Sequence, residues 1–431
     1  MTATPVPVAD ALADAHRREW AFVLAATVRV AGDLDLAEEC AQEAYVDALQ
    51  AWSRTGVPDR PGAWLMAAAK RRAIDGFRRE RMLEQKHETL VHELTQQTER
   101  GVTALDESID DHIGDDLLRL VFTACHPVLA REARVALTLR LLGGLATDEI
   151  ARAFLVPEAT VAQRIVRAKR TLAAARVPFE VPRGAEMQER LASVLEVIYL
   201  IFNEGYSATA GDSWTRPALC DEALRLGRIV ATLMPDESEV HGIVALMEIQ
   251  ASRLSARTSA DGTPILLLDQ NRARWDQLLI HRGLAALDRA ERLAEHAQQP
   301  LGPYALQASI AACHARARTA GETDWPRIAA LYDALAELTP SPVVELNRAV
   351  AVAMAFGPAA GLEIVDALRT EPALAGYHLL PSVRADFLAR LGRADEARME
   401  LERAAGLTRN ESERALLLER AATLGDASSE R

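Results

Sequence analysis

The chain has 431 residues, a length that favours about two to four domains over a single hydrophobic core. Hydrophobic residues make up 49% and aromatic residues only 5% of it, and this Ala-, Leu-, Arg- and Glu-rich composition is typical of an all-helical protein. The net charge of −13 argues against nucleic-acid binding unless basic residues cluster locally, and four cysteines without a CxxC pair argue against a disulfide framework or a structural zinc site.

The sequence carries no sign of secretion, membrane insertion or catalysis. Its first residues lack the apolar stretch of a signal peptide, and no apolar run approaches the length of a membrane-spanning helix. HExxH, GxSxG and phosphate-loop motifs do not occur. The adjacent pairs Cys125-His126 and Cys313-His314 do not predict a nucleophile with its base, because neighbours on a helix point about 100° apart. We therefore expect a cytoplasmic protein that is not an enzyme, needs no cofactor and does not bind membranes.

Residues 9–30 and 35–52 are the first two predicted helices, and Gly32-Asp33 separates them. The second helix is amphipathic, with an inward set of Leu36, Cys40, Ala44 and Leu49. Its other face is polar and acidic and carries Glu38, Glu39, Gln42 and Glu43. This face is either solvated or a docking surface for a basic partner, and the residues alone favour the first interpretation.

A turn-rich loop over 55–62 precedes a third predicted helix over 63–82, which carries most of a basic cluster. Residues 60–86 hold eight basic side chains against three acidic ones. Basic groups beside aromatic rings can hold backbone phosphates while unstacked bases lie on the rings. Trp64 and Phe77 supply such rings, with a place in the hydrophobic core as the alternative for both.

Residues 87–116 form an acidic connector with nine acidic side chains and one arginine. It lacks a sustained apolar stripe, so we expect much of it to be extended. By its charge alone it is a solubilising tether.

Residues 142–176 predict two short helices joined by a tight turn. Thr147 is placed to cap the first helix, and Val156-Pro157 ends it, with Pro157 in the first turn of the second helix. In the second helix one inward stripe recurs at helical spacing: Val161, Ile165, Ala168 and Leu172. The opposite side is polar and basic, as a helix that reads the major groove requires. The alternative is a solvated face on a buried hairpin.

Beyond a boundary near 177–184 the sequence predicts only helices. Residues 187–206 form a strongly apolar helix that Gly205 can terminate. A polar-aromatic cluster at its end is either a helix end and turn or a ligand or docking site: Asn203, Glu204, Tyr206, Asp212 and Trp214. Further helical patterns follow at 217–234, 236–256, 271–297, 303–320, 324–338, 343–356, 359–370, 377–391, 393–406 and 410–424. Residues 383–407 resemble the tetratricopeptide (TPR) pattern of paired helices, in which stacked pairs leave a concave surface suited to peptides or proteins.

Two of these regions resemble bacterial RNA polymerase sigma factors of the extracytoplasmic-function (ECF) group. Residues 15–81 resemble the second conserved region of that family, and residues 117–176 resemble the fourth. The segment GDLDLAEECAQEAYVDALQAW resembles the helix that binds core polymerase, and PGAWLMAAAKRRAIDGFRRERM resembles the part that melts and reads the −10 element. Arg71 stands where the family often has asparagine, and Ala162 and Gln163 stand where it often has lysine and serine. The promoter sequence therefore cannot be transferred to this chain.

The resemblance implies three groups of binding residues. Core polymerase would contact Asp35, Glu38, Glu39, Gln42 and Glu43. The opened −10 strand would contact Trp64, Lys70, Arg71, Arg72, Asp75, Arg78 and Arg79. The duplex −35 element would contact Glu158, Thr160, Ala162, Gln163, Arg164, Arg167, Lys169 and Arg170.

The resulting expectation is an all-α protein with two small sigma domains, an acidic linker and a large TPR-like helical domain. The two sigma domains are residues 9–86 and 117–177, the linker between them is residues 87–116, and the helical domain is residues 185–425. In sigma factors the linker threads a polymerase channel built for RNA, which a negative linker suits. The partners are core RNA polymerase, promoter DNA and a regulatory protein on the C-terminal helices. The alternatives are a helix-turn-helix regulator with a repeat-type sensor domain that acts on duplex DNA alone, and a protein-binding repeat scaffold.

Overall fold

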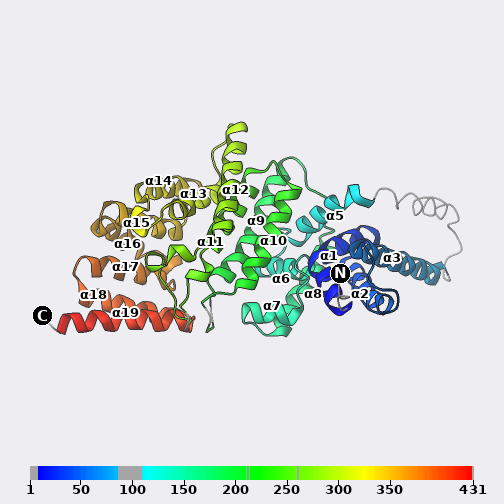
Figure 1. Ribbon diagram of the computed structural model, residues 1–431, viewed down its shortest axis with the longest axis horizontal. Coiled ribbons are helices and arrows are strands. Elements are labelled where there is room, and N and C mark those ends of the chain that lie inside the picture. The colour runs from blue at the N-terminus through cyan, green and yellow to red at the C-terminus, as the bar shows by residue number, and fades with distance from the viewer. Residues whose placement is uncertain (1–7, 86–108, 210, 213, 260–261, 430–431) are drawn as a thin grey trace, which may run out of the picture. The chain divides into compact units, whose positions relative to one another are not determined.

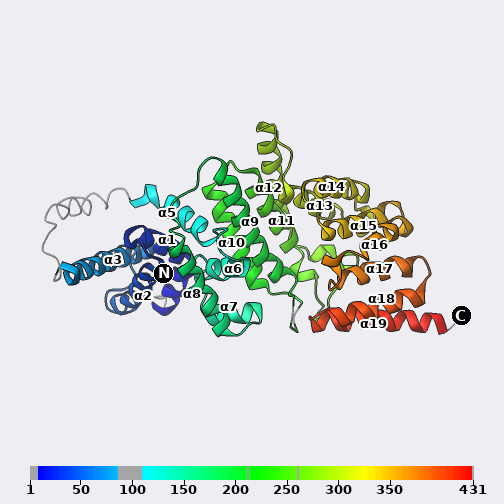
Figure 2. The same ribbon diagram turned by 180° about the vertical axis from the view of Figure 1, so that it is seen from behind.

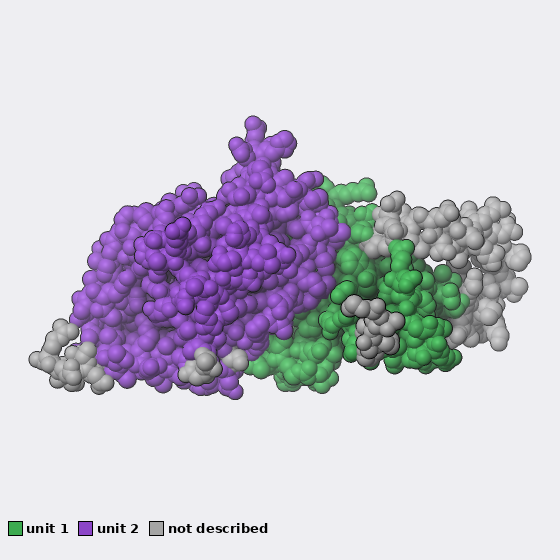
Figure 3. All heavy atoms as spheres, viewed as in Figure 1, with its two compact units in different colours: residues 1–197 green, residues 198–431 purple. Residues whose placement is uncertain are grey.

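The computed structural model describes residues 8–85, 109–209, 211–212, 214–259 and 262–429, without the side chains at 77–85, 109–113 and 425–429. Within these ranges the protein is helical and contains no strand, which confirms the all-helical prediction. The chain divides into two compact units, residues 1–197 and 198–431 (Figure 3). None of the helices in the described ranges is long and apolar enough to cross a bilayer.

The first three helices form a bundle in which each helix packs against the other two (Figure 1). They are α1 (Val8–Ala31), α2 (Leu34–Thr55) and α3 (Pro61–Gln85). The chain turns between α1 and α2 at Gly32, whose φ of 67° suits glycine. Asp33 then caps α2, because its Oδ1 accepts the backbone N–H groups of Asp35 and Leu36 at 2.8 and 2.9 Å.

The inward face of α2 differs from the predicted one at two positions. Leu49, expected inside, is 47% exposed, and Glu38, expected on the polar face, is 6% exposed. Tyr45 and Trp52 are buried instead, so the buried stripe of α2 is rotated from the predicted one. The prediction failed here because alanines at 37, 41 and 48, which were not expected inside, fit the interior as closely as longer apolar side chains.

Four helices continue the first unit: α5 (Ile109–Ala124), α6 (Arg131–Leu141), α7 (Thr147–Phe154) and α8 (Glu158–Ala174). Most of the expected linker lies outside the described residues, but its end from Ile109 onward belongs to α5. Asp116 in that end is buried and forms ion pairs with Arg29 at 3.3 Å and Arg119 at 2.9 Å. This end of the expected linker is therefore helical, and it packs at Asp116.

The two short helices α7 and α8 form the predicted helix-turn-helix. Val161, Ile165, Ala168 and Leu172 are all buried, which confirms the predicted stripe. Two details of the prediction are wrong. Thr147 is the first helical residue rather than the cap, and Glu149 reaches back to accept the N–H of Ala146 at 2.8 Å. Pro157 lies one residue before α8, after Leu155 has turned the chain with a φ of 48°.

Helix α9 (Ala185–Tyr206) spans the boundary between the two units. Its first half belongs to the first unit, where Arg190 donates to the carbonyl oxygen of Phe122 at 3.0 Å and Ser193 to that of Cys125 at 2.5 Å. Glu196 there accepts from Arg131 at 2.5 Å. The compact first unit thus extends beyond the predicted sigma domains by the first half of α9.

Helix α9 ends at Tyr206, as predicted, but Gly205 does not terminate it with a positive φ. It stays within the helix, where a Cβ atom would lie 2.7 Å from the backbone nitrogen of Cys220 and 2.8 Å from its sulfur. The glycine is therefore needed because α9 and α10 approach closely at this point.

The second unit continues with helices that pack chiefly on their neighbours in the chain (Figures 1 and 2). The α-helices are α10 (Pro217–Leu233), α11 (Ser238–Ala251), α12 (Gln277–His296), α13 (Pro303–Arg316), α14 (Trp325–Leu338), α15 (Pro342–Phe356), α16 (Pro358–Leu368), α17 (Leu379–Arg390), α18 (Ala394–Leu407) and α19 (Glu411–Ser429). Short 3-10 turns lie between some of them: η1 (Leu254–Ala256), η2 (Leu267–Asp269), η3 (Arg272–Arg274), η4 (Ala320–Glu322) and η5 (Pro372–Leu374). The ten predicted helical segments each coincide with one α-helix of this unit.

Candidate nucleic-acid and polymerase interface

The outer face of α8 carries most of the residues predicted to contact the −35 element. Five of these residues are exposed on that helix: Glu158, Ala162, Gln163, Arg167 and Arg170. Thr160 and Arg164 are half-buried at the edge of the face. The opposite side of α8 is buried, so these residues share one solvent-exposed face.

Lys169 lies apart from that face. Its side chain is only 10% exposed, and its Nζ donates to Asp35 at 2.5 Å and to Glu38 at 2.7 Å. Burial would lower the pKa of this lysine, but the hydrogen bonds to the two carboxylates raise it above its ordinary value. Lys169 therefore joins α8 to α2 in this structure, and two residues predicted to bind polymerase are its partners.

Glu38 has a second cation beside it. Its Oε1 lies 2.5 Å from Nη2 and 2.6 Å from Nε of Arg140, which follows it by 102 residues. Nothing in the local sequence around Arg140 predicts this pair, since an arginine near a helix end is ordinary. Gly144, in the turn before α7, adds to the contact, because a Cβ atom there would lie 2.9 Å from the ring of His16. The helix-turn-helix thus packs directly on the first bundle.

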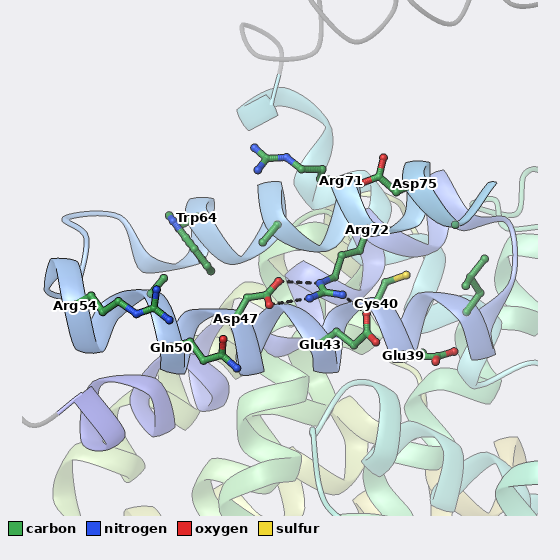
Figure 4. A pocket seen from close by; sticks show the side chains of 14 residues that line it. Glu39, Cys40, Glu43, Asp47, Gln50, Arg54, Trp64, Arg71, Arg72 and Asp75 are labelled. Atoms are coloured by element: carbon green, nitrogen blue, oxygen red, sulfur yellow. Dashed lines mark hydrogen bonds and ion pairs between the residues drawn. The ribbon is translucent and has the colours of Figure 1, made fainter. Parts of the chain in front are cut away.

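A groove of about 660 Å³ runs between α2 and α3 (Figure 4). It brings together residues from two of the predicted groups, because Glu39 and Glu43 line it from α2 while Trp64, Arg71 and Asp75 line it from α3. Gln42 is exposed on the same helix as Glu39 and Glu43. The groove is therefore acidic along α2 and mixed in charge along α3.

Arg72 crosses this groove. Its Nε donates to Oδ2 of Asp47 at 2.8 Å and its Nη2 to Oδ1 at 2.7 Å, and it also bonds to Glu43. This bidentate hydrogen bond lowers the pKa of Asp47, and the same bond raises that of Arg72. In this structure Arg72 holds α3 to α2, and a contact with DNA would require it to leave Asp47.

The other residues predicted to contact the −10 strand lie along α3 with different exposure. Arg71 and Asp75 are exposed at the α3 edge of the groove, and their side chains extend from that edge away from α2 in Figure 4. Trp64 is half-buried and packs edge-on against Trp52, with 5.7 Å between ring centres. Burial, followed by repulsion from Arg29, lowers the pKa of Lys70. Arg78 and Arg79 lie further along α3, and their side chains lie outside the described residues.

Three family models match consecutive parts of this chain. Residues 16–82 match sigma-70 region 2, residues 119–172 match sigma-70 region 4, and residues 190–291 match a family of unknown function (DUF6596). The two sigma-70 domains support a sigma-factor role in promoter recognition and transcription initiation, and with it binding to core RNA polymerase and promoter DNA. An uncharacterised protein of Rhizobium meliloti (strain 1021) is 45% identical over 397 residues, which cover 91% of each chain. The chain belongs to the same family as that protein.

Proposed function

We propose that this protein is an ECF-group (group 4) sigma factor that acts in the cytoplasm and whose C-terminal helical domain regulates it. The observation that carries the proposal is the order of its parts. An acidic helix for docking, a basic helix beside a tryptophan, and an arginine-bearing helix-turn-helix follow one another within one compact unit. Core polymerase supplies the nucleotidyl transfer, so this chain needs no catalytic group.

In this proposal the exposed carboxylates of α2, Glu39 and Glu43, bind core polymerase together with Gln42. Arg71 and neighbouring basic residues of α3 hold the opened −10 strand. The −35 element is read by Gln163, Arg167 and their neighbours on α8, which lie on one exposed face. Opening the duplex costs a few kcal/mol per flipped base, which phosphate contacts and stacking must offset.

Permanganate footprinting tests the proposal on promoter fragments selected from genomic DNA with this protein and core polymerase. Thymines near −10 should react only when both proteins are present. Arg167→Ala should weaken open-complex formation by on the order of 10- to 100-fold, the cost of losing one base-reading arginine. Arg369→Ala, an exposed arginine of the second unit, is the matched control and should leave the footprint unchanged.

The same experiment separates the alternative regulator. Such a protein would bind duplex DNA by itself, would not associate with core polymerase and would produce no reactive thymines. That result would refute the sigma-factor proposal.

The regulatory part of the proposal rests on the second unit having a hydrophobic core of its own. Leu380 and Phe387 of α17 pack with Ala397 and Leu401 of α18 in that core, and the small residues where these helices meet support a TPR-like pairing. Phe387→Ala should cost about 3–5 kcal/mol of stability there, because it removes a fully buried ring. If the second unit regulates, transcription from the selected promoter should change with this variant. Unchanged output from a chain whose second unit has lost protection from hydrogen exchange would refute regulation by that unit.

A further inference from the structure

Six side chains of the second unit alternate between aromatic rings and guanidinium groups. In order they are Trp214, Arg257, Tyr206, Arg253, Trp275 and Arg272, and we call this set the arginine–aromatic ladder. Cζ of Arg257 lies 3.8 Å from the ring centre of Tyr206 and 5.6 Å from that of Trp214. Cζ of Arg253 lies 5.6 Å from Tyr206 and 5.7 Å from Trp275, and Cζ of Arg272 lies 5.0 Å from Trp275.

The ladder is assembled from three separate stretches of chain. Tyr206 ends α9, Arg253 and Arg257 flank the turn η1, and Arg272 begins η3. Two members of the cluster that the sequence placed at the end of α9, Tyr206 and Trp214, thus belong to a larger group. All six residues lie within 190–291, the segment that matches the family of unknown function.

Within the described part of the chain none of the three arginines forms an ion pair with a carboxylate, although the charge of Glu322 partly opposes the lowering of the Arg272 pKa by burial and by Arg253. Arg253 donates to the hydroxyl of Tyr206 at 2.6 Å, and Arg272 donates to the carbonyl oxygens of His314 and Ala317 at 2.7 Å each. Arg384, elsewhere in this unit, shows the usual arrangement, because it is paired with Asp366 at 2.7 Å and with Glu400 at 3.0 Å. Three clustered cations without such carboxylates repel one another, and an anion bound beside them would reduce that cost.

The hydrogen-bonding groups of the ladder indicate the chemistry of the missing partner. Five of its buried N–H groups have no hydrogen-bond partner: Nε of Arg253, Arg257 and Arg272, and Nε1 of Trp214 and Trp275. All five are donors. A ligand that satisfies them must present several acceptor oxygens and negative charge.

We propose that the ladder is a binding site for a small phosphate-type anion. A phosphate group offers more acceptor oxygens than a carboxylate and matches the planar fork of arginine. The aromatic rings hold the guanidinium groups in place by cation–π contact, so little side-chain freedom remains to be lost on binding. The residues of the ladder all belong to the second unit, whereas those assigned to DNA and polymerase belong to the first, so this proposal does not depend on the proposed function.

Isothermal titration of the full chain with sodium pyrophosphate and with sodium phosphate tests this proposal. Sodium citrate at matched ionic strength is the carboxylate comparison. We expect saturable binding of one phosphate-type ion per chain, with citrate at least tenfold weaker. Arg257→Met should weaken binding at least tenfold, whereas Arg292→Met, at an exposed arginine of α12, should not change it.

Arg253→Lys provides a second variant in case Arg257→Met does not fold. It retains the charge and removes the fork, so it should also bind more weakly. Absence of saturable binding to the folded wild-type chain would show that the ladder only stabilises the fold and would overturn the proposal. Citrate binding as tightly as pyrophosphate would overturn the assignment to phosphate chemistry.

Discussion

Replacing Glu38 with alanine tests whether the helix-turn-helix is held against the first bundle by one buried carboxylate. The Glu38 side chain is 8% exposed, and those of its partners Arg140 and Lys169 are 22% and 10% exposed. Removing one partner of a fully buried ion pair costs about 3–5 kcal/mol. Lys169 would keep Asp35, whose side chain is 75% exposed, so we expect about 2–4 kcal/mol.

This loss is large enough to measure by calorimetry. A domain of this size loses about 2–4 °C of melting temperature for each kcal/mol of unfolding free energy that it loses. The melting temperature of the first unit should therefore fall by about 5–15 °C. Hydrogen exchange of peptides from α2 and α8 assigns the transition to that unit, because the two units need not unfold together. A double-mutant cycle with Lys169→Met should give a coupling energy of about 0.5–3 kcal/mol.

Glu39 is the matched control, since it is the next residue on the same helix and is exposed. Glu39→Ala should change stability by no more than about 0.5 kcal/mol. If Glu38→Ala and Glu39→Ala melt at the same temperature, the ion pairs of Glu38 contribute nothing to the packing of the two regions, and our argument fails.

Three further predictions concern other positions. Lys169→Met should destabilise the first unit and leave the salt dependence of duplex binding unchanged. Loss of a lysine that contacts phosphate would instead reduce the slope of log binding constant against log salt concentration by about 1. A reduced slope without loss of stability would therefore place Lys169 on DNA. Gly205→Ala should lower the free energy of unfolding by about 1–3 kcal/mol in thermal unfolding, because the new methyl group would meet the Cys220 backbone. The control Gly376→Ala, where no atom lies within 4 Å of the new methyl group, should lower it by no more than about 1 kcal/mol. Equal effects would contradict the close approach of α9 and α10. Burial, followed by Arg253 and Arg272, lowers the pKa of His314 from 6.5 to about 3. As pH falls, the His314 imidazole is therefore protonated in the unfolded chain before it is protonated in the folded one. The stability that neutral His314 contributes is present above about pH 6.5 and is lost as pH falls, and the free energy of unfolding should drop by about 2 kcal/mol between pH 7 and pH 5. His314→Gln should reduce this loss in urea titrations at the two pH values, and an unchanged pH dependence would show that His314 does not stay neutral.

Periodic patterns were enough to place most of the helices, although α5 and α6 were not predicted individually and α5 begins within the expected linker. The stripe of Val161, Ile165, Ala168 and Leu172 is buried as predicted, because burial of one helix face depends on spacing that the sequence displays directly. The end of α9 at Tyr206 was also predicted, but the reason given for Gly205 was wrong, because this glycine stays helical and does not terminate α9 with a positive φ. The close approach of Cys220, which explains that glycine, comes from a different helix and has no local signal.

The sequence by itself determined the all-helical class, the order of the two sigma regions and the exposed face of α8. Only the tertiary structure decided which charged residues are available on those surfaces. Glu38 and Lys169 pair with each other, Arg72 pairs with Asp47, and three arginines of the second unit gather around aromatic rings. The physical reason is that hydrophobic periodicity is a local property, whereas the pairing of charges depends on residues that folding brings together from distant parts of the chain.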